Sequence, residues 1–314
     1  MIRLASKNDL CTVNNLVKEM FFEVSGDLNQ LGYQDNYLEK FVANKGDVIF
    51  VAEENKNIVG FISVEQHFES ENFIYFDDFC VTKNYRNRSI GKSLIFEALN
   101  YALKNNFDTI YLHVEKSNKK AISLYKKLCF EISEETEERL KFCLKLPQKV
   151  QYFVNNQSYV CLKLLGKGKG GYTYKAINNL GEFVALKLIH HEPCDYYNFG
   201  DKFEAEINDY KILIEIGILM PKLIGVDKEK EVIVKELIDG PTIAQMIEAG
   251  NDVSNYVPEM KEIAEKLKRN NLNIDYFPTN FMVKENKLIY VDFECNKFMD
   301  EWSFENWGIK YWSK

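Results

Sequence analysis

The feature that most constrains the fold is a strand-like segment that runs into a short basic turn and then into a helix. The segment Phe73–Val81 is rich in aromatic and β-branched residues, which predicts a strand. Residues 82–90 contain Arg86 and Arg88, and a helical period begins near Gly91. A helix N-terminus presents unpaired N–H groups and the positive end of the helix dipole. This junction therefore predicts an anion site, although a solvated basic turn before a capped helix has the same pattern.

The other segments of the first half predict a mixed α/β fold. Apolar residues recur with a helical period in some segments, whereas β-branched and aromatic runs mark strands in others. The strands are expected at Ile2–Leu4, Val48–Ala52, Ile58–Glu65, Phe73–Val81, Thr109–Val114 and Lys141–Leu146, and the helices at Asn8–Phe22, Gly91–Asn105 and Lys119–Leu128.

Two motifs of this half, in this order, resemble those of the GNAT family. Residues Arg86–Gly91 match its coenzyme A loop, Arg/Gln-x-x-Gly-x-Gly/Ala, and Asn118–Phe130 match its later segment, Asn-x-x-Ala-x-x-Leu-Tyr-x-Lys-x-Gly-Phe. Ser89 and Cys129 stand where the family usually has glycine. The resemblance covers about residues 1–146. It implies an acetyl-coenzyme A-dependent N-acetyltransferase with a mixed central sheet flanked by helices.

The same resemblance implies roles for individual residues. Tyr125 would be the general acid that protonates the departing thiolate, or else a core aromatic of an amphipathic helix. Asp77 or Asp78 would accept a proton from the amine through water, and because side chains alternate along a strand, we expect only one to face the substrate. The implied cofactor-binding residues are Phe79, Val81, Arg86, Asn87, Arg88, Ser89, Ile90, Gly91, Lys92, Ser93 and Asn118.

A new pattern begins after a polar stretch at residues 147–157, which we interpret as a linker or a lead-in strand. A glycine-rich turn between strands follows, and then helices alternate with further strands. The expected strands are Tyr159–Leu165, Glu182–Ile189 and Val232–Leu237, with a hairpin of Phe281–Val283 and Leu288–Val291, and the expected helices are Lys202–Ile216 and Val257–Arg269.

The glycine-rich turn precedes a strand pattern and not a helix, which argues against a dinucleotide site. Lys187 lies on the next strand, an arrangement typical of a protein-kinase-like ATP site. Glu206 on the following helix is the expected partner of Lys187, and Glu204 is the alternative. The glycines of the GxGxxG pattern are Gly166, Gly168 and Gly171.

Further acidic and amide residues follow in the order that such a site needs. Asp275 and Asn280 have the spacing of a catalytic loop, and Asp292 follows a strand. This half resembles minimal kinases related to the RIO and aminoglycoside phosphotransferase groups, over about residues 158–296. The resemblance implies ATP and Mg²⁺, with Asp275 at the acceptor hydroxyl and Asn280 and Asp292 on the metal. Glu236 to Ile238 would be the hinge that meets adenine.

Three departures from the kinase pattern shape the expected function. Asn273 stands where the catalytic loop usually has histidine, Glu294 replaces the glycine of the metal motif, and no large helical lobe follows Asp292 in this sequence. We therefore expect a protein phosphoacceptor, autophosphorylation or an ATP-sensing module, and no built-in pocket for a small acceptor. The alternatives are a regulatory nucleotide-binding pseudokinase and an aminoglycoside-modifying resistance enzyme.

The expected organisation is a GNAT domain of the α+β or α/β class over residues 1–146, a linker over 147–157 and a truncated protein-kinase-like domain over 158–314. The acetyl acceptor is expected to be an amine of a small molecule or a polypeptide. All three tryptophans lie near the end of the sequence, between Trp302 and Trp312. They predict packing under the short lobe, with an exposed partner patch as the alternative.

Composition excludes several classes of function. A net charge of -7 disfavours nucleic-acid binding through phosphate neutralisation. Seven cysteines, an odd number without a CxxC pair, indicate free thiols in a reducing compartment. Four histidines lack the spacing of zinc ligands, and neither a signal peptide nor a membrane span is expected. We therefore expect a cytoplasmic enzyme.

Overall fold

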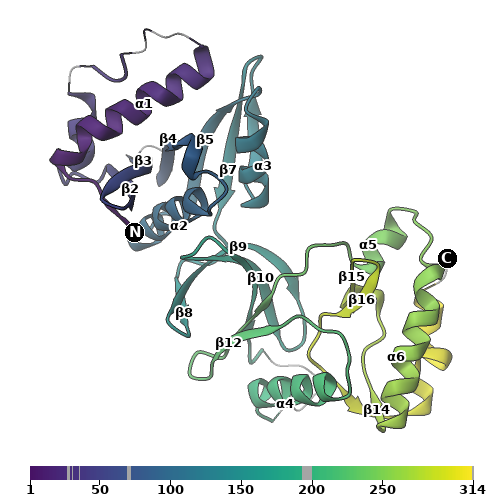
Figure 1. Cartoon of the computed structure of the whole chain (residues 1–314). Helices are drawn as coiled ribbons and strands as arrows, with labels where there is room; N and C mark the ends of the chain where they lie inside the picture. The colour runs from purple at the N-terminus through teal and green to yellow at the C-terminus, as the bar shows by residue number, and fades with distance from the viewer. Residues whose placement is uncertain (27–28, 30, 35, 69–71, 193–199, 313–314) are drawn as a thin grey trace. The chain divides into compact units, whose positions relative to one another are not determined.

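The computed structural model describes residues 1–26, 29, 31–34, 36–68, 72–192 and 200–312. The chain forms two compact units (Figure 1). The first unit comprises Met1–Gly166 and Thr173–Leu186, and the second comprises Lys167–Tyr172 and Lys187–Lys314. The division passes through three strands, which are Gln157–Lys167, Gly171–Asn178 and Phe183–Ile189.

The first unit contains a seven-stranded mixed sheet with the order β1-β2-β3-β4-β5-β7-β6. Only β4 and β5 pair in parallel, with Ile74–Phe76 opposite Ile110–Leu112, and the other neighbours in this sheet are antiparallel. The strands are β1 (Ile2–Leu4), β2 (Val48–Glu54), β3 (Asn57–Phe68), β4 (Asn72–Val81), β5 (Thr109–Glu115), β6 (Glu131–Glu135) and β7 (Arg139–Lys145).

Helices cover both faces of this sheet because its strands alternate apolar side chains between two cores. On β2, Phe50 and Ala52 pack into the core under α2 (Ile90–Lys104), whereas Ile49 and Val51 pack against α1 (Leu10–Ser25). Helix α3 (Lys119–Lys127) contributes Tyr125 to the core under α2. Figure 1 shows α1 on the opposite side of the sheet from α2. Short 3-10 turns lie at Lys7–Asp9, Tyr37–Val42 and Lys83–Tyr85.

The elements expected in the first half are confirmed, with shifts of a few residues at their ends. Helix α1, for example, begins at Leu10 after a 3-10 turn and ends at Ser25. Strand β6 was not predicted. All five of its residues are exposed, so its sequence carries no alternation of apolar and polar residues.

A second, six-stranded sheet has the order β12-β13-β11-β10-β9-β8. Its strands are β8 (Tyr152–Val154), β9 (Gln157–Lys167), β10 (Gly171–Asn178), β11 (Phe183–Ile189), β12 (Leu223–Asp227) and β13 (Val232–Glu236). Strand β12 was not predicted. It is short, carries Gly225, and its pairing with β13 has a register shift between Leu223 and Gly225, which weakens its alternation.

The remaining elements of the second unit surround one apolar core. The helices are α4 (Lys202–Glu215), α5 (Ile243–Glu248) and α6 (Val257–Arg269), and the small sheets pair β14 (Leu272–Asn273) with β17 (Asn296–Lys297) and β15 (Phe281–Lys284) with β16 (Lys287–Tyr290). Short turns lie at Ser254–Tyr256, Pro278–Asn280, Asp300–Trp302, Phe304–Gly308 and Ile309–Tyr311.

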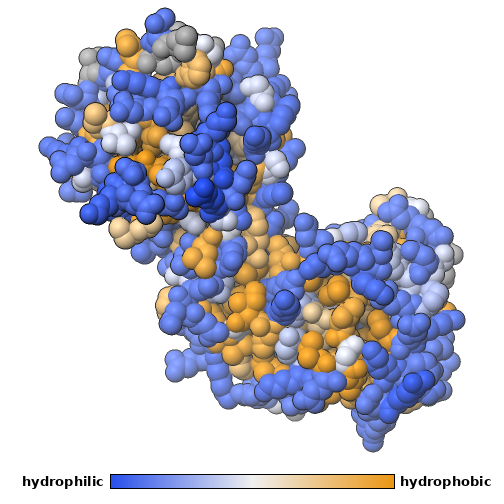
Figure 2. Space-filling view, in the orientation of Figure 1, coloured by the Kyte–Doolittle hydropathy of each residue, from blue (hydrophilic) through white to orange (hydrophobic). Residues whose placement is uncertain are grey.

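The tryptophans near the end of the sequence have different environments. Trp312 is 1% exposed, packs against Phe281 and Phe304, and donates its indole N–H to the carbonyl of Tyr276 at 2.8 Å. Trp302 is 45% exposed. The packing interpretation is therefore confirmed for Trp312 and wrong for Trp302. Figure 2 shows a largely hydrophilic face that is interrupted by apolar patches.

Within the residues that the structure describes, no helix is long and apolar enough to cross a membrane. Six cysteines are free thiols, and Cys194 lies outside the described residues. The described histidines, cysteines, aspartates and glutamates form no group of three or more that could hold a metal ion.

Replacing the buried tryptophan should destabilise the second unit far more than replacing the exposed one. We expect Trp312→Ala to lower the free energy of unfolding by about 3–5 kcal/mol, because a large cavity opens in the core. Trp302→Ala is the matched control, with an expected loss of less than about 1 kcal/mol. Urea unfolding followed by circular dichroism measures both changes, and equal midpoints for the two variants would contradict the packing role.

Candidate active site

The predicted anion site lies at the start of α2. Ser89 precedes the helix with a φ of 60° and therefore has a left-handed backbone, as does Asn87 with a φ of 63°. The first helical bond of this turn runs from the amide of Ser93 to the carbonyl of Ser89 at 3.0 Å. The earlier amides of the turn have no helical partner of their own. A left-handed φ explains why glycine is usual at the position of Ser89.

Gly91 allows α2 to pack closely against β4. A Cβ at this position would lie 2.9 Å from the ring carbon Cζ of Phe79, which is too close for a real contact. Phe79 and Val81 both pack against the core under α2. Their side chains are therefore used in packing.

The cationic side chains of the turn differ in what they contact. Arg86 donates to the carbonyl of Val81 at 2.7 Å and forms an ion pair with Glu23 at 2.7 Å, so it fixes the turn to β4 and α1. The guanidinium of Arg88 lies 5.2 Å from the ring centre of Tyr85, and its side chain is exposed. Arg88 is therefore better placed than Arg86 to meet an anion.

The second motif places Asn118 and Tyr125 on α3. Asn118 is the N-cap of this helix, and its side-chain oxygen accepts the amide hydrogen of Ala121 at 3.1 Å. The ring of Tyr125 is buried between Phe130 and Phe142, with centroids 5.7 and 6.0 Å away. Burial, and next the proximity of Tyr75, raise the pKa of Tyr125 well above its ordinary value. A hydroxyl with such a pKa stays protonated at neutral pH and can act as a proton donor.

A β-bulge on β4 brings the two candidate bases together. Ile62 pairs with Phe79 and Val64 pairs with Phe76, so Ser63 alone lies opposite both Asp77 and Asp78. The hydroxyl of Ser63 accepts the amide hydrogen of Asp78 at 2.8 Å. The extra residue interrupts the regular alternation of side chains.

Both aspartates lie near tyrosines of the segment that follows α1. The hydroxyl of Tyr37 lies 3.4 Å from the carboxylate of Asp77, and Tyr33 interacts with Asp78. The prediction that the two side chains face opposite sides is therefore wrong, because the bulge turns them toward the same side.

The surroundings of these carboxyl groups raise their pKa values. Burial, followed by the neighbouring charge of Asp77, raises the pKa of Asp78 to about 7. Burial and Glu65 also raise the pKa of Asp77. The ammonium of Lys40 lies 2.6 Å from the carboxylate of Glu65 and offsets part of the negative charge. The cluster of Glu65, Asp77 and Asp78 is acidic and favours a cationic amine beside the central strands β3 and β4.

Tyr75 and His113 also lie beside this cluster, and the sequence motifs did not predict them as site residues. The hydroxyl of Tyr75 on β4 forms a short hydrogen bond with Nδ1 of His113 on β5. Burial, and then Asp77, raise the pKa of Tyr75 to about 12. Burial and the positive charges of Lys141 and Arg139 lower the pKa of His113, so this imidazole is neutral at pH 7 and can accept a proton. Both residues lie on predicted strands, but only the parallel pairing of those strands brings them together.

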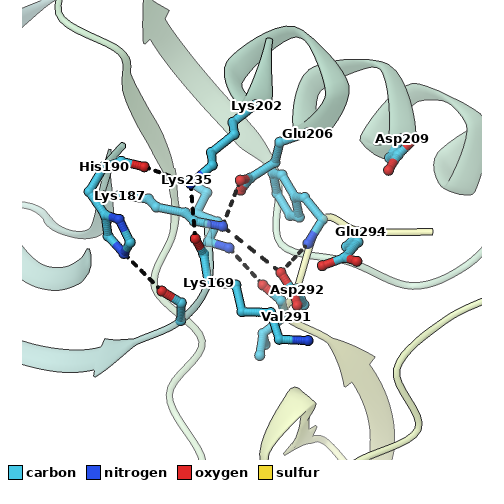
Figure 3. Close-up of polar contacts among 12 residues, drawn as sticks. Lys169, Lys187, His190, Lys202, Glu206, Asp209, Lys235, Val291, Asp292 and Glu294 are labelled. Atoms are coloured by element: carbon cyan, nitrogen blue, oxygen red, sulfur yellow. Dashed lines mark hydrogen bonds and ion pairs between the residues drawn. The ribbon is translucent and has the colours of Figure 1, made fainter. Parts of the chain in front are cut away.

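In the second unit, Lys187 and Glu206 form the expected ion pair (Figure 3). Their charged atoms lie 2.6 Å apart, and the side chains are 10% and 9% exposed. Asp292 lies 4.0 Å from the same ammonium. Burial lowers the pKa of Lys187, but Glu206 and Asp292 outweigh burial and raise it above its ordinary value. The alternative partner, Glu204, contacts Lys228 instead.

A second buried lysine, which the sequence analysis missed, lies beside this pair. The ammonium of Lys235 on β13 donates to the carbonyl of Val291 at 2.6 Å and lies 4.1 Å from the ring centre of Phe293. Burial, and then the charge of Lys187, lower the pKa of Lys235 to about 8. Lys235 therefore fixes the segment that carries Asp292. In the segment expected to be the adenine hinge, Glu236 forms an ion pair with Lys284 at 2.8 Å. Ile238 of the same segment is buried.

The loop expected to carry the acceptor-binding aspartate is held by local hydrogen bonds. Asp275 accepts the amide hydrogen of Phe277 at 3.1 Å, and the side chain of Asn280 donates to the carbonyl of Asp275 at 3.3 Å. The amide of Val291 donates to the carbonyl of Asn280 at 2.9 Å, which brings Asn280 close to the segment of Asp292.

Asn273 and the expected glycines have separate structural roles. Asn273 is buried, accepts the hydroxyl hydrogen of Tyr276 at 3.2 Å and donates to the carbonyl of Met299 at 3.0 Å. Gly171 is required because a Cβ there would lie 2.3 Å from the carbonyl oxygen of Leu188. Gly166 and Gly168 have open space around them.

Comparison with known proteins assigns the class of the first half, which is that of the N-acetyltransferases. The model of the acetyltransferase (GNAT) family matches residues 13–130. N-alpha-acetyltransferase 50 of Danio rerio is 34% identical over 112 residues, which cover 34% of this chain and 67% of that protein. The uncharacterized N-acetyltransferase YhfO of Bacillus subtilis is 29% identical over 153 residues, which cover 47% of this chain and 99% of that protein.

One of the solved structures that match this chain is the PaiA N-acetyltransferase of Thermoplasma acidophilum in complex with coenzyme A. It is 20% identical, with a TM-score of 0.38, and the match covers 46% of this chain and 98% of that one. The chain belongs to the GNAT acetyltransferase family, and its N-terminal half is an acetyl-coenzyme A-dependent N-acetyltransferase domain.

The left-handed backbone at Ser89 should make glycine the more stable residue there. We expect Ser89→Gly to raise the free energy of unfolding by about 0.5 kcal/mol, because relief of the left-handed strain exceeds the entropy cost of glycine. Ser93→Gly, inside α2, is the control, and it should lower the free energy of unfolding by about 0.5–1 kcal/mol. Chemical denaturation measures both changes, and a loss of stability in both variants would show that Ser89 is not strained.

Proposed function

We propose that the first half transfers the acetyl group of acetyl-coenzyme A to an amine of a small molecule or a polypeptide. The observation that carries this proposal is the junction of β4 and α2, where open helix amides lie at the end of the strand that bears Asp77 and Asp78. One relative, N-alpha-acetyltransferase 50, is named for transfer to an α-amine, which supports an amine acceptor.

The residues of the turn would bind the phosphates of the cofactor. The amides from Ile90 to Lys92 supply hydrogen-bond donors at the positive end of the α2 dipole, and Arg88 and Lys92 supply charge. Arg86 would act by fixing the turn, since Glu23 and Val81 already occupy its donors. The remaining residues proposed for this surface are Phe79, Val81, Asn87, Ser89, Gly91 and Asn118.

The acidic cluster would attract a protonated amine and then accept a proton from it. Asp78 is a better base than Asp77 because its pKa of about 7 lies close to neutral pH. The pair of Tyr75 and His113 would offer a second route for the same proton, since the hydroxyl and the neutral imidazole share a hydrogen bond. Tyr125 would protonate the thiolate that leaves when the acetyl group is transferred.

The substitution Tyr125→Phe tests whether Tyr125 is the general acid that protonates the leaving thiolate. The ring of Tyr125 is packed and its hydroxyl alone is removed, so the fold should persist. We expect kcat for acetyl transfer to fall by about 100-fold, while the dissociation constant of coenzyme A stays the same. Steady-state kinetics and calorimetry measure the two quantities, and unchanged turnover would exclude the acid role.

The pH dependence of kcat/KM tests whether Asp78 is the general base. A base must be ionised, so activity should rise as the pH increases through the pKa of Asp78, about 7. Asp78→Asn should remove this ionisation from the profile, whereas Asp77→Asn should shift it to lower pH by removing a neighbouring charge. If the ionisation survives in Asp78→Asn and disappears in His113→Gln, the proton leaves through Tyr75 and His113 instead.

We infer further that residues 158–314, after a linker at 147–157, form a truncated protein-kinase-like domain that uses ATP and Mg²⁺ to phosphorylate a protein hydroxyl. The supporting observation is the buried pair of Lys187 and Glu206, with Asp292 beside it. Lys187 would hold phosphate oxygens, Asp275 would orient the acceptor hydroxyl, and Asn280 and Asp292 supply oxygen ligands of the kind that Mg²⁺ takes. Gly166, Gly168, Gly171, Glu236 and Ile238 would complete the nucleotide site.

Asp292→Ala should abolish magnesium-dependent ATP turnover, because the carboxylate that holds the metal is lost. Phosphate release and protein phosphorylation with labelled ATP measure the effect, and Asp300→Ala serves as a control. Binding of ATP without any turnover by the wild-type chain would favour the regulatory alternative. Phosphorylation or acetylation of an aminoglycoside would favour the resistance enzyme.

A further inference from the structure

Four aromatic side chains of the second unit form a continuous surface patch, and they are Phe277, Trp302, Trp307 and Tyr311. The ring of Trp307 is central, with its centroid 5.4 Å from that of Trp302 and 5.1 Å from that of Tyr311. The ring of Phe277 lies 4.7 Å from Tyr311 and 6.4 Å from Trp307. Trp302 is 45% exposed and Phe277 is 38% exposed. We call these four side chains the aromatic patch.

Packing in the core accounts for only half of the aromatic patch. Trp307 and Tyr311 pack against the apolar core of the second unit, whereas Trp302 and Phe277 do not belong to that core. Large aromatic side chains gathered at a surface are typical of a binding site, because their contact with water is unfavourable. Tryptophan and tyrosine are also enriched among the residues that contribute most to protein interfaces.

Local hydrogen bonds hold the segment that carries most of the aromatic patch. The amide of Trp307 donates to the carbonyl of Ser303 at 2.9 Å. The side chain of Asn306 donates to the carbonyl of Asp300 at 2.8 Å. A partner would therefore meet rings that are already ordered, and less conformational entropy is lost on binding.

The charged residues of this segment are mainly acidic. Residues 299–312, all of which the structure describes, contain one cation, Lys310, and three exposed carboxylates, which are Asp300, Glu301 and Glu305. Such a surface repels the phosphates of nucleic acids and of anionic lipids, and it attracts a cationic partner.

The position of Lys310 shows that the rings can accept a cation. Its ammonium lies 4.9 Å from the ring centre of Tyr311 and 5.6 Å from that of Trp307. The faces of aromatic rings attract cations, and the guanidinium of arginine stacks on them better than the ammonium of lysine does. Aromatic faces with carboxylates around them therefore fit an arginine-rich segment.

Phe277 connects the aromatic patch to the loop that carries Asp275. The amide of Phe277 donates to the carboxylate of Asp275 at 3.1 Å. The indole N–H of Trp312 donates to the carbonyl of Tyr276 at 2.8 Å, which ties the same loop to the segment of the other three rings. A polypeptide that covers the aromatic patch would therefore lie beside Asp275.

We propose that the aromatic patch is the docking surface for an arginine-rich segment of the protein phosphoacceptor. Arginine side chains stack on the rings and pair with the carboxylates around them, and a hydroxyl of the same polypeptide reaches Asp275. This inference rests on the phosphoryl transfer proposed above. It adds a partner of stated chemistry and a surface that lies outside the kinase motifs.

The first test measures binding to the full chain without nucleotide. The probes are a synthetic peptide of alternating arginine and serine and a peptide in which every arginine is replaced by lysine. We expect the arginine peptide to bind more tightly, because bulk charge attracts both peptides equally and only stacking distinguishes them. Calorimetry at low ionic strength measures both affinities. Equal affinities, or no binding of the arginine peptide, would overturn the proposal.

Two substitutions with opposite expected effects test the aromatic patch itself. Trp302→Ala leaves the net charge unchanged and should weaken binding of the arginine peptide by about five- to tenfold. Lys310→Gln removes the cation that already lies over the rings and should strengthen it by about threefold. Phe153→Ala, which removes another exposed ring from the second sheet, is the matched control and should change nothing. Equal binding by wild type and Trp302→Ala would overturn the docking role.

Addition of ATP and Mg²⁺ separates the docking surface from the phosphoryl transfer. If phosphate reaches the serines of the bound peptide, Trp302→Ala should raise KM and leave kcat unchanged, because the ring only binds. Tight binding of the arginine peptide without any transfer of phosphate would confirm the docking surface. It would overturn the acceptor role together with the proposed kinase activity.

Discussion

Strand β4 is the element on which the acetyltransferase half depends. It pairs in antiparallel with β3 and in parallel with β5, and the parallel pairing covers only Ile74–Phe76. Beyond that point the bulge opposite Ser63 turns both aspartates to one side. At its end the chain enters the left-handed turn before α2. The proposed acceptor side and the proposed phosphate side of the site thus both lie on one strand and its irregularities.

The second unit depends instead on charge that is buried. Removing an ammonium and a carboxylate from water is costly, and only close pairing offsets that cost. Lys187 meets this condition through Glu206, and Lys235 and Lys202 meet it through main-chain carbonyls. Three nearly buried lysines in one region serve poorly as a device for stability alone. They are the charges that the proposed nucleotide site would use to receive phosphates.

Local sequence patterns predicted a large part of this structure. The turn from Arg86 to Gly91 and the helix after Asn118 are read from contiguous residues, and the pair of Lys187 and Glu206 follows from the order of a strand and a helix. Apolar periodicity located the central strands because each has a buried face. Strand β6 was not predicted because none of its residues is buried. The roles proposed for the individual site residues remain predictions.

The contacts that sequence reasoning missed depend on tertiary structure. Tyr75 and His113 meet only because β4 and β5 pair in parallel, and no local pattern marks that pairing. The bulge at Asp77 and Asp78 has no glycine to reveal it, so regular alternation was the natural but wrong expectation. Lys202 resembles an ordinary exposed lysine of a first helical turn until the loop that it contacts is in place.

The indole of Trp312 has a consequence for the lifetime of the second unit. Its N–H is bonded to the carbonyl of Tyr276, the residue that follows Asp275. Removal of the indole of Trp312 would therefore release the loop of Asp275 at the same time as it opens the core.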